Sequence, residues 1–163
     1  TVAIGAIETY GFISANRSKA GYVQVYAFDG ASWSQLGQDI DGEAAGDESG
    51  YSVSLSADGK TVAIGAPSND GVNGAASGHV RVYGFDGANW SRLGQDSDGE
   101  AAFDLSGSSV SLSADGKTVA IGAPSNDGVN GAASGHVRVY GFDGASWSQL
   151  GQDIDGEAAG DDS

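Results

Sequence analysis

The sequence contains no cysteine and no methionine, and only seven of its 163 residues are Lys or Arg. Without cysteine the chain has no disulfide and no thiolate for catalysis or metal binding, and cysteine usage cannot indicate its redox compartment. The basic residues occur singly, whereas nucleic acids and anionic membranes are bound by clustered positive charge. We therefore expect no nucleic-acid partner.

Long apolar runs are also missing, because none approaches the roughly 18 residues that a membrane-spanning helix needs. We expect no membrane insertion. No signal peptide heads the sequence, and Thr1 already lies inside a repeat. We expect the sequence to be part of a longer chain whose targeting segment lies upstream. The 22 acidic residues give a formal charge of −15, which suits a cation-rich exterior or divalent-ion binding.

Glycine is abundant, and its 28 residues disfavour helix by roughly 1 kcal/mol each. Strand patterns are clear instead. Tyr51, Val53 and Leu55 alternate with serines, which places one face on a core and the other in water. Asp58-Gly59 then predicts a tight turn into a second strand over 61–66. Two further strands are predicted over 79–83 and 90–93.

The sequence repeats itself. The segment that starts at Thr61 returns almost letter for letter at Thr118, and a divergent, slightly longer copy starts at Thr1. We predict three modules: 1–60 without its first strand, 61–117, and an incomplete 118–163. The predicted fold is all-β, with tandem four-stranded antiparallel blade-like modules of the β-propeller type in a closed ring or an open array.

The phrase SVSLSADGKTVAIGAP, followed by GHVRVY, resembles the FG-GAP repeats of integrin alpha-type β-propellers. The resemblance implies a propeller blade, an extracellular setting and an adhesive or ligand-binding role. That family usually carries a calcium loop of the form DxNxDGxxD between its first two strands. Here the connection is only Ser56 to Lys60, so we expect the usual calcium site to be absent. Three modules are also fewer than the family's ring of about seven.

An acidic loop follows each module and supplies the candidate calcium ligands, because calcium prefers several converging carboxylate and carbonyl oxygens. The alternative is a solvated turn whose Asp side chains accept hydrogen bonds from backbone amides. The candidate ligands are Asp39, Asp41, Glu43, Asp47, Asp96, Asp98, Glu100, Asp104, Asp153, Asp155, Glu157 and Asp161. Apart from calcium, no cofactor is predicted.

Other polar and aromatic positions recur with the repeat. His79 and His136 lack the further ligands that zinc needs, and we interpret them as surface strand residues. One tryptophan per module is expected to fill the module core, with carbohydrate stacking as the alternative; these are Trp33, Trp90 and Trp147. Asn16 and Asn89 begin N-x-S sequons in predicted turns and are candidate glycosylation sites in a secreted protein.

No residue set indicates catalysis: the abundant serines never form G-x-S-x-G, and the acidic pairs recur with the repeat instead of marking one cleft. We expect a non-enzymatic extracellular structural or adhesive protein that self-associates as a filament or surface coat. The strand at Thr1 lacks its hairpin partner, and an unpaired edge invites a neighbouring chain. The alternative is a β-propeller module that binds a protein or glycan ligand, with or without calcium.

Overall fold

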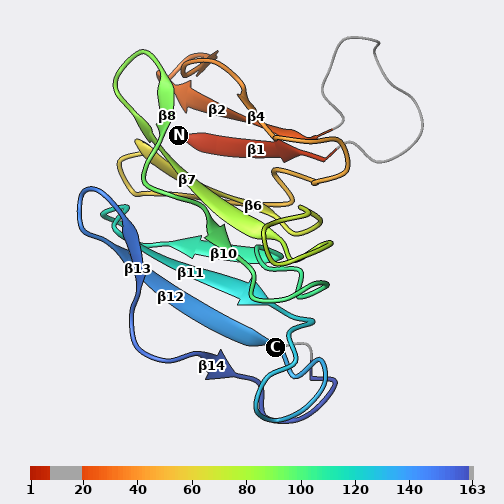
Figure 1. The fold of residues 1–163 in the computed structure, drawn as a ribbon. Helices are drawn as coiled ribbons and strands as arrows, with labels where there is room; N and C mark the ends of the chain where they lie inside the picture. Colours follow the sequence, from red (N-terminus) through yellow and green to blue (C-terminus); the bar gives the residue numbers. More distant parts are fainter. Residues whose placement is uncertain (8–19, 162–163) are drawn as a thin grey trace.

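The computed structural model describes residues 1–7 and 20–161, which form three antiparallel β-sheets and contain no helix (Figure 1). The predicted all-β, blade-like fold is confirmed. The first sheet contains β1 (Val2–Ala6), β2 (Tyr22–Phe28), β3 (Trp33–Gln35) and β4 (Ile40–Asp41). The second contains β5 (Ser52–Leu55), β6 (Thr61–Ala66), β7 (His79–Phe85), β8 (Trp90–Arg92) and β9 (Ser97–Asp98). The third contains β10 (Ser109–Leu112), β11 (Thr118–Ala123), β12 (His136–Phe142), β13 (Trp147–Gln149) and β14 (Ile154–Asp155).

The hairpin predicted around Asp58-Gly59 joins β5 to β6 in antiparallel register. Gly59 has a φ of 69°, which glycine adopts without steric cost. The Asp58 carboxylate accepts hydrogen bonds from the Ser56 hydroxyl at 2.6 Å and the Lys60 amide at 3.0 Å. These two bonds lower the pKa of Asp58. Hydrogen bonds within the turn therefore stabilise it.

The last strand of each sheet is broken in two, which the sequence patterns did not predict. In the second sheet, β8 pairs with one end of β7 and β9 with the other. Gly94 lies in the break with a φ of 72°, and a Cβ added there would lie 3.0 Å from Cδ1 of Trp147 in the next sheet. The break thus leaves space for the neighbouring tryptophan.

The hydrophobic cores lie between neighbouring sheets. One core joins the first and second sheets through Val23, Val25, Ile40, Val62, Ile64 and Trp90. Another joins the second and third sheets through Ala63, Val80, Val82, Leu112, Val119, Ile121 and Trp147. A Cβ at Gly65 would collide with the Gly107 carbonyl oxygen, so only glycine fits this close approach. Each sheet therefore depends on its neighbour for burial.

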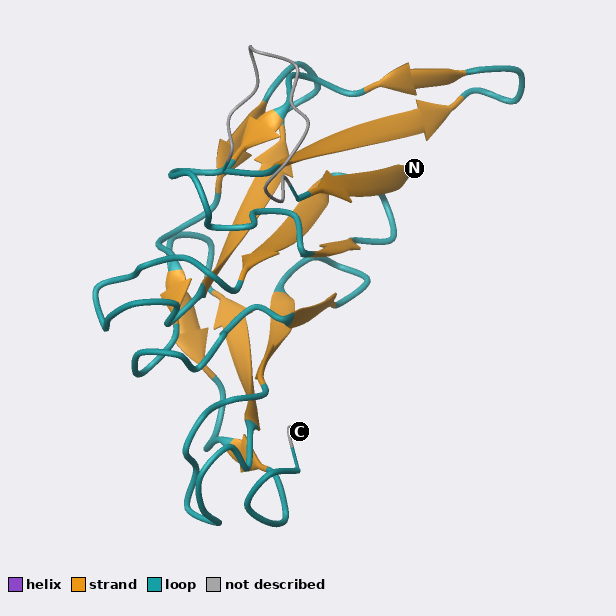
Figure 2. Cartoon of the chain, turned by 90° about the vertical axis from the view of Figure 1, so that its right-hand side faces the viewer, coloured by secondary structure: helices purple, strands orange, loops and turns teal. Residues whose placement is uncertain are grey.

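The three sheets follow one another as an open row, with the first and third sheets at its two ends (Figures 1 and 2). The sheets and the sequence repeats do not start at the same residues. The second sheet begins at Ser52 on β5, whereas the repeat begins at Thr61 on β6. The division into modules at 1–60, 61–117 and 118–163 stays a prediction.

Phe103 has a φ of 70°, although the equivalent residues of the neighbouring repeats are Gly46 and Gly160. Its side chain is exposed, so little packing offsets the strain of this left-handed conformation. We expect Phe103→Gly to raise the free energy of unfolding by about 1 kcal/mol. Urea denaturation measures this, with Gly46→Phe as the reverse substitution expected to destabilise. A lower stability of Phe103→Gly would contradict the argument.

Candidate functional site at the module junctions

Arg81 on β7 is the centre of a polar cluster where the first and second sheets meet. Its Nε and Nη2 donate to Asp96 Oδ1 and Oδ2 at 3.0 and 2.8 Å, a bidentate pair. Nη2 also forms an ion pair with Glu43, in the loop after β4 of the preceding sheet. The Arg81 side chain is mostly buried, whereas that of Glu43 is half exposed. One guanidinium thus ties two sheets together.

The cluster returns at the next junction. Arg138 donates to Asp153 Oδ1 and Oδ2 at 3.1 and 3.0 Å and pairs with Glu100 of the preceding sheet. In the first sheet Gln24 occupies the arginine position and donates to Asp39 Oδ1 at 2.9 Å. The first sheet therefore has the carboxylate but no guanidinium.

Burial and charge act in opposite directions on these groups. Burial disfavours charge on Arg81, but the carboxylates of Asp96 and Glu43 outweigh it and raise the pKa of Arg81. Burial likewise favours protonated Asp96, but the hydrogen bond and charge of Arg81 prevail and lower the pKa of Asp96. Burial and the charge of Arg81 lower the pKa of His79. At neutral pH the cluster therefore contains charged Arg81 and Asp96 beside a neutral imidazole.

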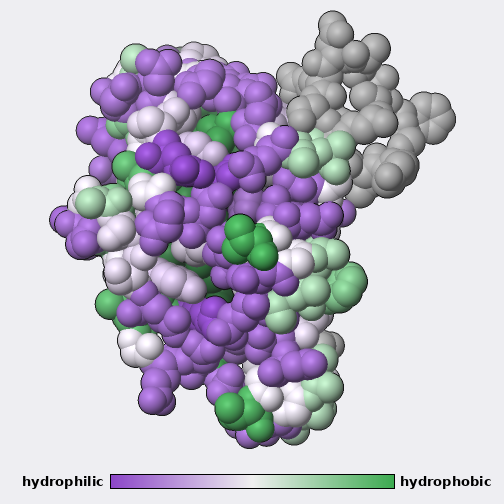
Figure 3. Space-filling view, in the orientation of Figure 1, coloured by the Kyte–Doolittle hydropathy of each residue, from purple (hydrophilic) through white to green (hydrophobic). Residues whose placement is uncertain are grey.

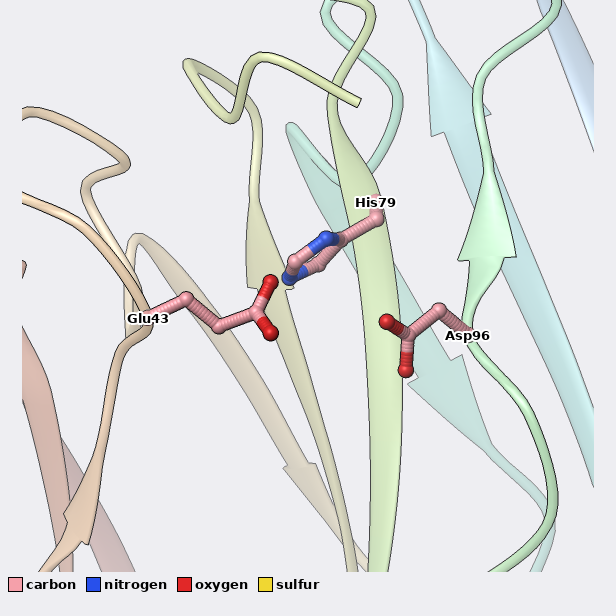
Figure 4. A group of neighbouring side chains, drawn as sticks. All are labelled: Glu43, His79 and Asp96. Carbon is pink, nitrogen blue, oxygen red and sulfur yellow. The ribbon is translucent and has the colours of Figure 1, made fainter. Parts of the chain in front are cut away.

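His79 and His136 are buried, so the interpretation as surface residues is wrong. They are the first residues of β7 and β12. Figure 4 shows the Glu43 carboxylate pointing towards the His79 ring, and the Asp96 carboxylate approaches from the segment after β8. His136 Nδ1 lies 3.9 Å from Asp153 Oδ2, too far for a hydrogen bond, and has no hydrogen-bond partner among the described residues.

Potential metal ligands come within 4.8 Å of one another in two groups among the described residues. These are Glu43, His79 and Asp96 at the first junction, and Glu100, His136 and Asp153 at the second. In each group the arginine already contacts both carboxylates. A metal ion would therefore have to displace the guanidinium or bind beside a positive charge.

The four acidic residues of one loop are not gathered into a single group within the described residues. Asp39 and its counterparts Asp96 and Asp153 accept hydrogen bonds from the strands of their own sheet. Asp41, Asp98 and Asp155 end the short strands β4, β9 and β14. Glu43 and Glu100 reach the next sheet, and Glu157 lies in the exposed loop after β14. Asp47, Asp104 and Asp161 accept backbone amides of their own turns, from Ala44, Ala101 and Ala158. Calcium binding by these residues stays a prediction.

Trp90 fills a core, as predicted, but that core lies between two sheets. Its indole Nε1 donates to the Leu36 carbonyl at 2.7 Å. The Gln38 side chain continues the contact, because its Nε2 donates to the Trp90 carbonyl at 2.9 Å and its Oε1 accepts the Trp90 amide at 3.1 Å. Trp147 makes the same bonds with Leu93 and Gln95. Trp33, by contrast, is exposed.

The sequence did not single out the arginines and glutamines of the junctions. The available signal was a basic residue inside an alternating apolar strand, His79-Val80-Arg81-Val82-Tyr83, which returns at His136 in the next repeat. Of the two sequons, Asn89 lies in the exposed turn after β7. Asn16 lies outside the described residues. Glycosylation of either stays a prediction.

Comparison with known families gives a match to the FG-GAP repeat over residues 29–83. This range begins just after β2 and continues into β7, so it spans the first junction. The equivalent segment of the next repeat, 86–140, is nearly identical in sequence. No curated protein matches the chain. The part of the chain that the structure describes contains no helix with the length and hydrophobicity to span a membrane. Residues 29–83 are therefore similar to the FG-GAP repeat, and 86–140 repeat that segment.

Proposed function

We propose that the protein is a non-enzymatic, extracellular structural or adhesive repeat protein that self-associates as a filament or surface coat. One observation carries the proposal: the aromatic, amide and charged side chains of each junction join one sheet to the next. The Arg81 cluster and the Trp90 contacts both recur at the following junction. Stability that accumulates through neighbour contacts is typical of extended repeat arrays.

The surface supports the same proposal. Hydrophilic residues cover most of the face seen in Figure 3, with hydrophobic residues scattered between them. The net charge of −15 opposes non-specific aggregation between chains. Association would therefore depend on specific surfaces and on ionic strength. The similarity of residues 29–83 to FG-GAP repeats, which are typically extracellular, supports the proposed extracellular setting.

Self-association is tested by analytical ultracentrifugation over a concentration series, with negative-stain electron microscopy of the concentrated sample. We expect species larger than the monomer that grow with concentration and appear as ordered rows of sheets. Monodisperse monomers at every concentration would rule out self-association by this chain.

Chelation tests the role of calcium. Because Arg81 and Arg138 already neutralise the carboxylates that approach one another, we expect EDTA to leave the melting temperature unchanged. Differential scanning fluorimetry with EDTA, and with added calcium or magnesium, measures this. A melting temperature that rises with calcium but not with magnesium would favour the calcium-dependent alternative.

The alternative function, ligand binding by a propeller-type module, is favoured by one groove beside the second junction. The groove has a volume of about 730 Å³ and is lined in part by Glu100, Phe103, Leu105 and Asp127. Phe103 exposes its ring there in a strained backbone conformation, which occurs at ligand sites. A glycan array with the protein and with Phe103→Ala tests it. Binding lost in the variant would support this function, and an empty array would count against a glycan ligand.

A further inference from the structure

His136 places an unpartnered ring nitrogen inside the second junction. Its side chain is 3% exposed, and its Nδ1 has no hydrogen-bond partner within residues 1–7 and 20–161. Nδ1 lies 3.9 Å from Asp153 Oδ2. Potential ligand atoms of His136, Asp153 and Glu100 all lie within 4.8 Å of one another. Because buried polar atoms in folded proteins nearly always have a partner, this nitrogen and the two carboxylates beside it indicate a ligand.

The three groups form a donor set that suits a transition metal. An imidazole nitrogen is a typical ligand of zinc, copper, nickel and iron, whereas calcium and magnesium prefer oxygen ligands alone. Zinc sites with one open position use three protein ligands, and histidine with carboxylate is a known combination. The sequence shows no further zinc ligand near His136, but the fold brings Glu100 and Asp153 to it.

A surface hollow gives an ion access to these residues. It has a volume of about 450 Å³, and its lining includes Glu100, Asp153 and Asp155. Asp155 on β14 pairs with His136 on β12 in the antiparallel register. Water in the hollow therefore has access to the fourth coordination position, as in zinc sites that keep one position open.

The guanidinium of Arg138 competes with an ion for the same carboxylates, since it contacts both Asp153 and Glu100. An ionised carboxylate has about four lone-pair positions, so it can accept from arginine and bind an ion at the same time. The Glu100 side chain is 48% exposed, which leaves it room to turn towards the ion. Repulsion between Arg138 and the ion then lowers the affinity without blocking the site.

The second junction has one positive charge fewer than the first. At the first junction, Arg81 and Arg92 both contact Asp96. At the second, Gln149 stands at the position of Arg92 and donates to Asp153 Oδ1 at 2.6 Å. A neutral amide does not repel a cation, so of the two junctions the second is the better metal site.

We propose that the second junction binds a zinc ion through His136 Nδ1 and the carboxylates of Asp153 and Glu100. Glu100 follows β9 of the second sheet, whereas the other two ligands belong to the third sheet, so the ion links the sheets. The metal-free junction is already joined by the ion pairs of Arg138, and zinc adds stability to it. This inference goes beyond the proposed function and does not depend on self-association.

Isothermal titration calorimetry of the EDTA-treated, dialysed chain with zinc chloride tests the site. Excess magnesium chloride is present to occupy weak sites on the acidic surface. We expect one zinc ion per chain, and an affinity at least about tenfold lower in His136→Gln, which loses a ligand. Gln149→Arg restores the charge of the first junction at an exposed position and is expected to weaken binding about tenfold. His79→Gln is the matched control and leaves the affinity unchanged.

Magnetic resonance gives a second readout on the unsubstituted chain, because the sequence contains only two histidines. In long-range proton–nitrogen spectra we expect zinc to shift Nδ1 of His136 and to leave the His79 ring unchanged, with His79→Gln assigning the signals. This readout and Gln149→Arg decide the matter even if His136→Gln fails to fold. Absence of zinc binding, binding that survives His136→Gln in folded protein, or a shift of neither ring would overturn the site. A loss confined to His79→Gln would overturn it as well.

Discussion

Replacing Trp90 with alanine is expected to lower the free energy of unfolding by about 3–5 kcal/mol, the range for large aromatic residues in cores. The ring is buried between two sheets, packs on Phe85 at a centroid distance of 5.0 Å, and donates to the Leu36 carbonyl. Its loss leaves a cavity and also leaves that carbonyl without its donor. Urea unfolding followed by circular dichroism measures the change.

Trp33→Ala is the matched control, because the residue and its strand position are the same but the side chain is exposed. In dilute protein, where copies do not associate, we expect a change within about 0.5 kcal/mol. Equal losses at the two positions would show that tryptophan stabilises its own module, and that the junction contributes little. Trp147→Ala should behave like Trp90→Ala, since it repeats the same contacts.

The sequence predicted the strands where alternation was strong. Val62 and Ile64 alternate with small residues, and both are buried on β6. The division of the strand into β8 and β9 was not predicted, and neither was the packing of Trp147 of the next sheet against Gly94 in that break. Gly94 looks like an ordinary turn glycine until Trp147 is seen against it. Local patterns therefore predicted the strands of each sheet, but they did not predict the contacts between repeats.

The acidic loops show the same limit. Read along the sequence, Asp39, Asp41 and Glu43 resemble the start of a cation loop. In space they separate, because Asp39 turns to its own sheet and Glu43 reaches Arg81 in the next. Three strands of the second sheet begin between Glu43 and its partner Arg81. The two residues are therefore too far apart in the sequence to belong to one local motif. The only sign of an ion pair between repeats in the sequence is that its acidic and basic residues both recur with the repeat.

Arg81→Gln is expected to lower the free energy of unfolding by about 2–3 kcal/mol, less than a fully buried pair because Glu43 is half exposed. The variant leaves Asp96, largely covered, without its bidentate donor. Arg92→Gln is the matched control. Arg92 also contacts Asp96, at 2.8 Å, but its side chain is 47% exposed, so we expect a loss under about 1 kcal/mol. Equal losses would show that the charge of Arg81 matters and its burial does not.

The loss caused by Arg81→Gln should depend on pH. In the wild-type protein the pKa of Asp96 is lowered from 3.8, so its ionised form stabilises the fold above about pH 4, and this contribution is lost as the pH falls through the folded-state pKa. Without Arg81, burial favours the protonated form of Asp96, and protonation in acid relieves a charge that the exposed Arg92 offsets only in part. The stability difference between the two proteins should therefore shrink as the pH falls from 7 to 3. Urea unfolding across this range measures it, and a difference that stays constant with pH would show that Arg81 stabilises the junction by packing rather than by its ion pairs.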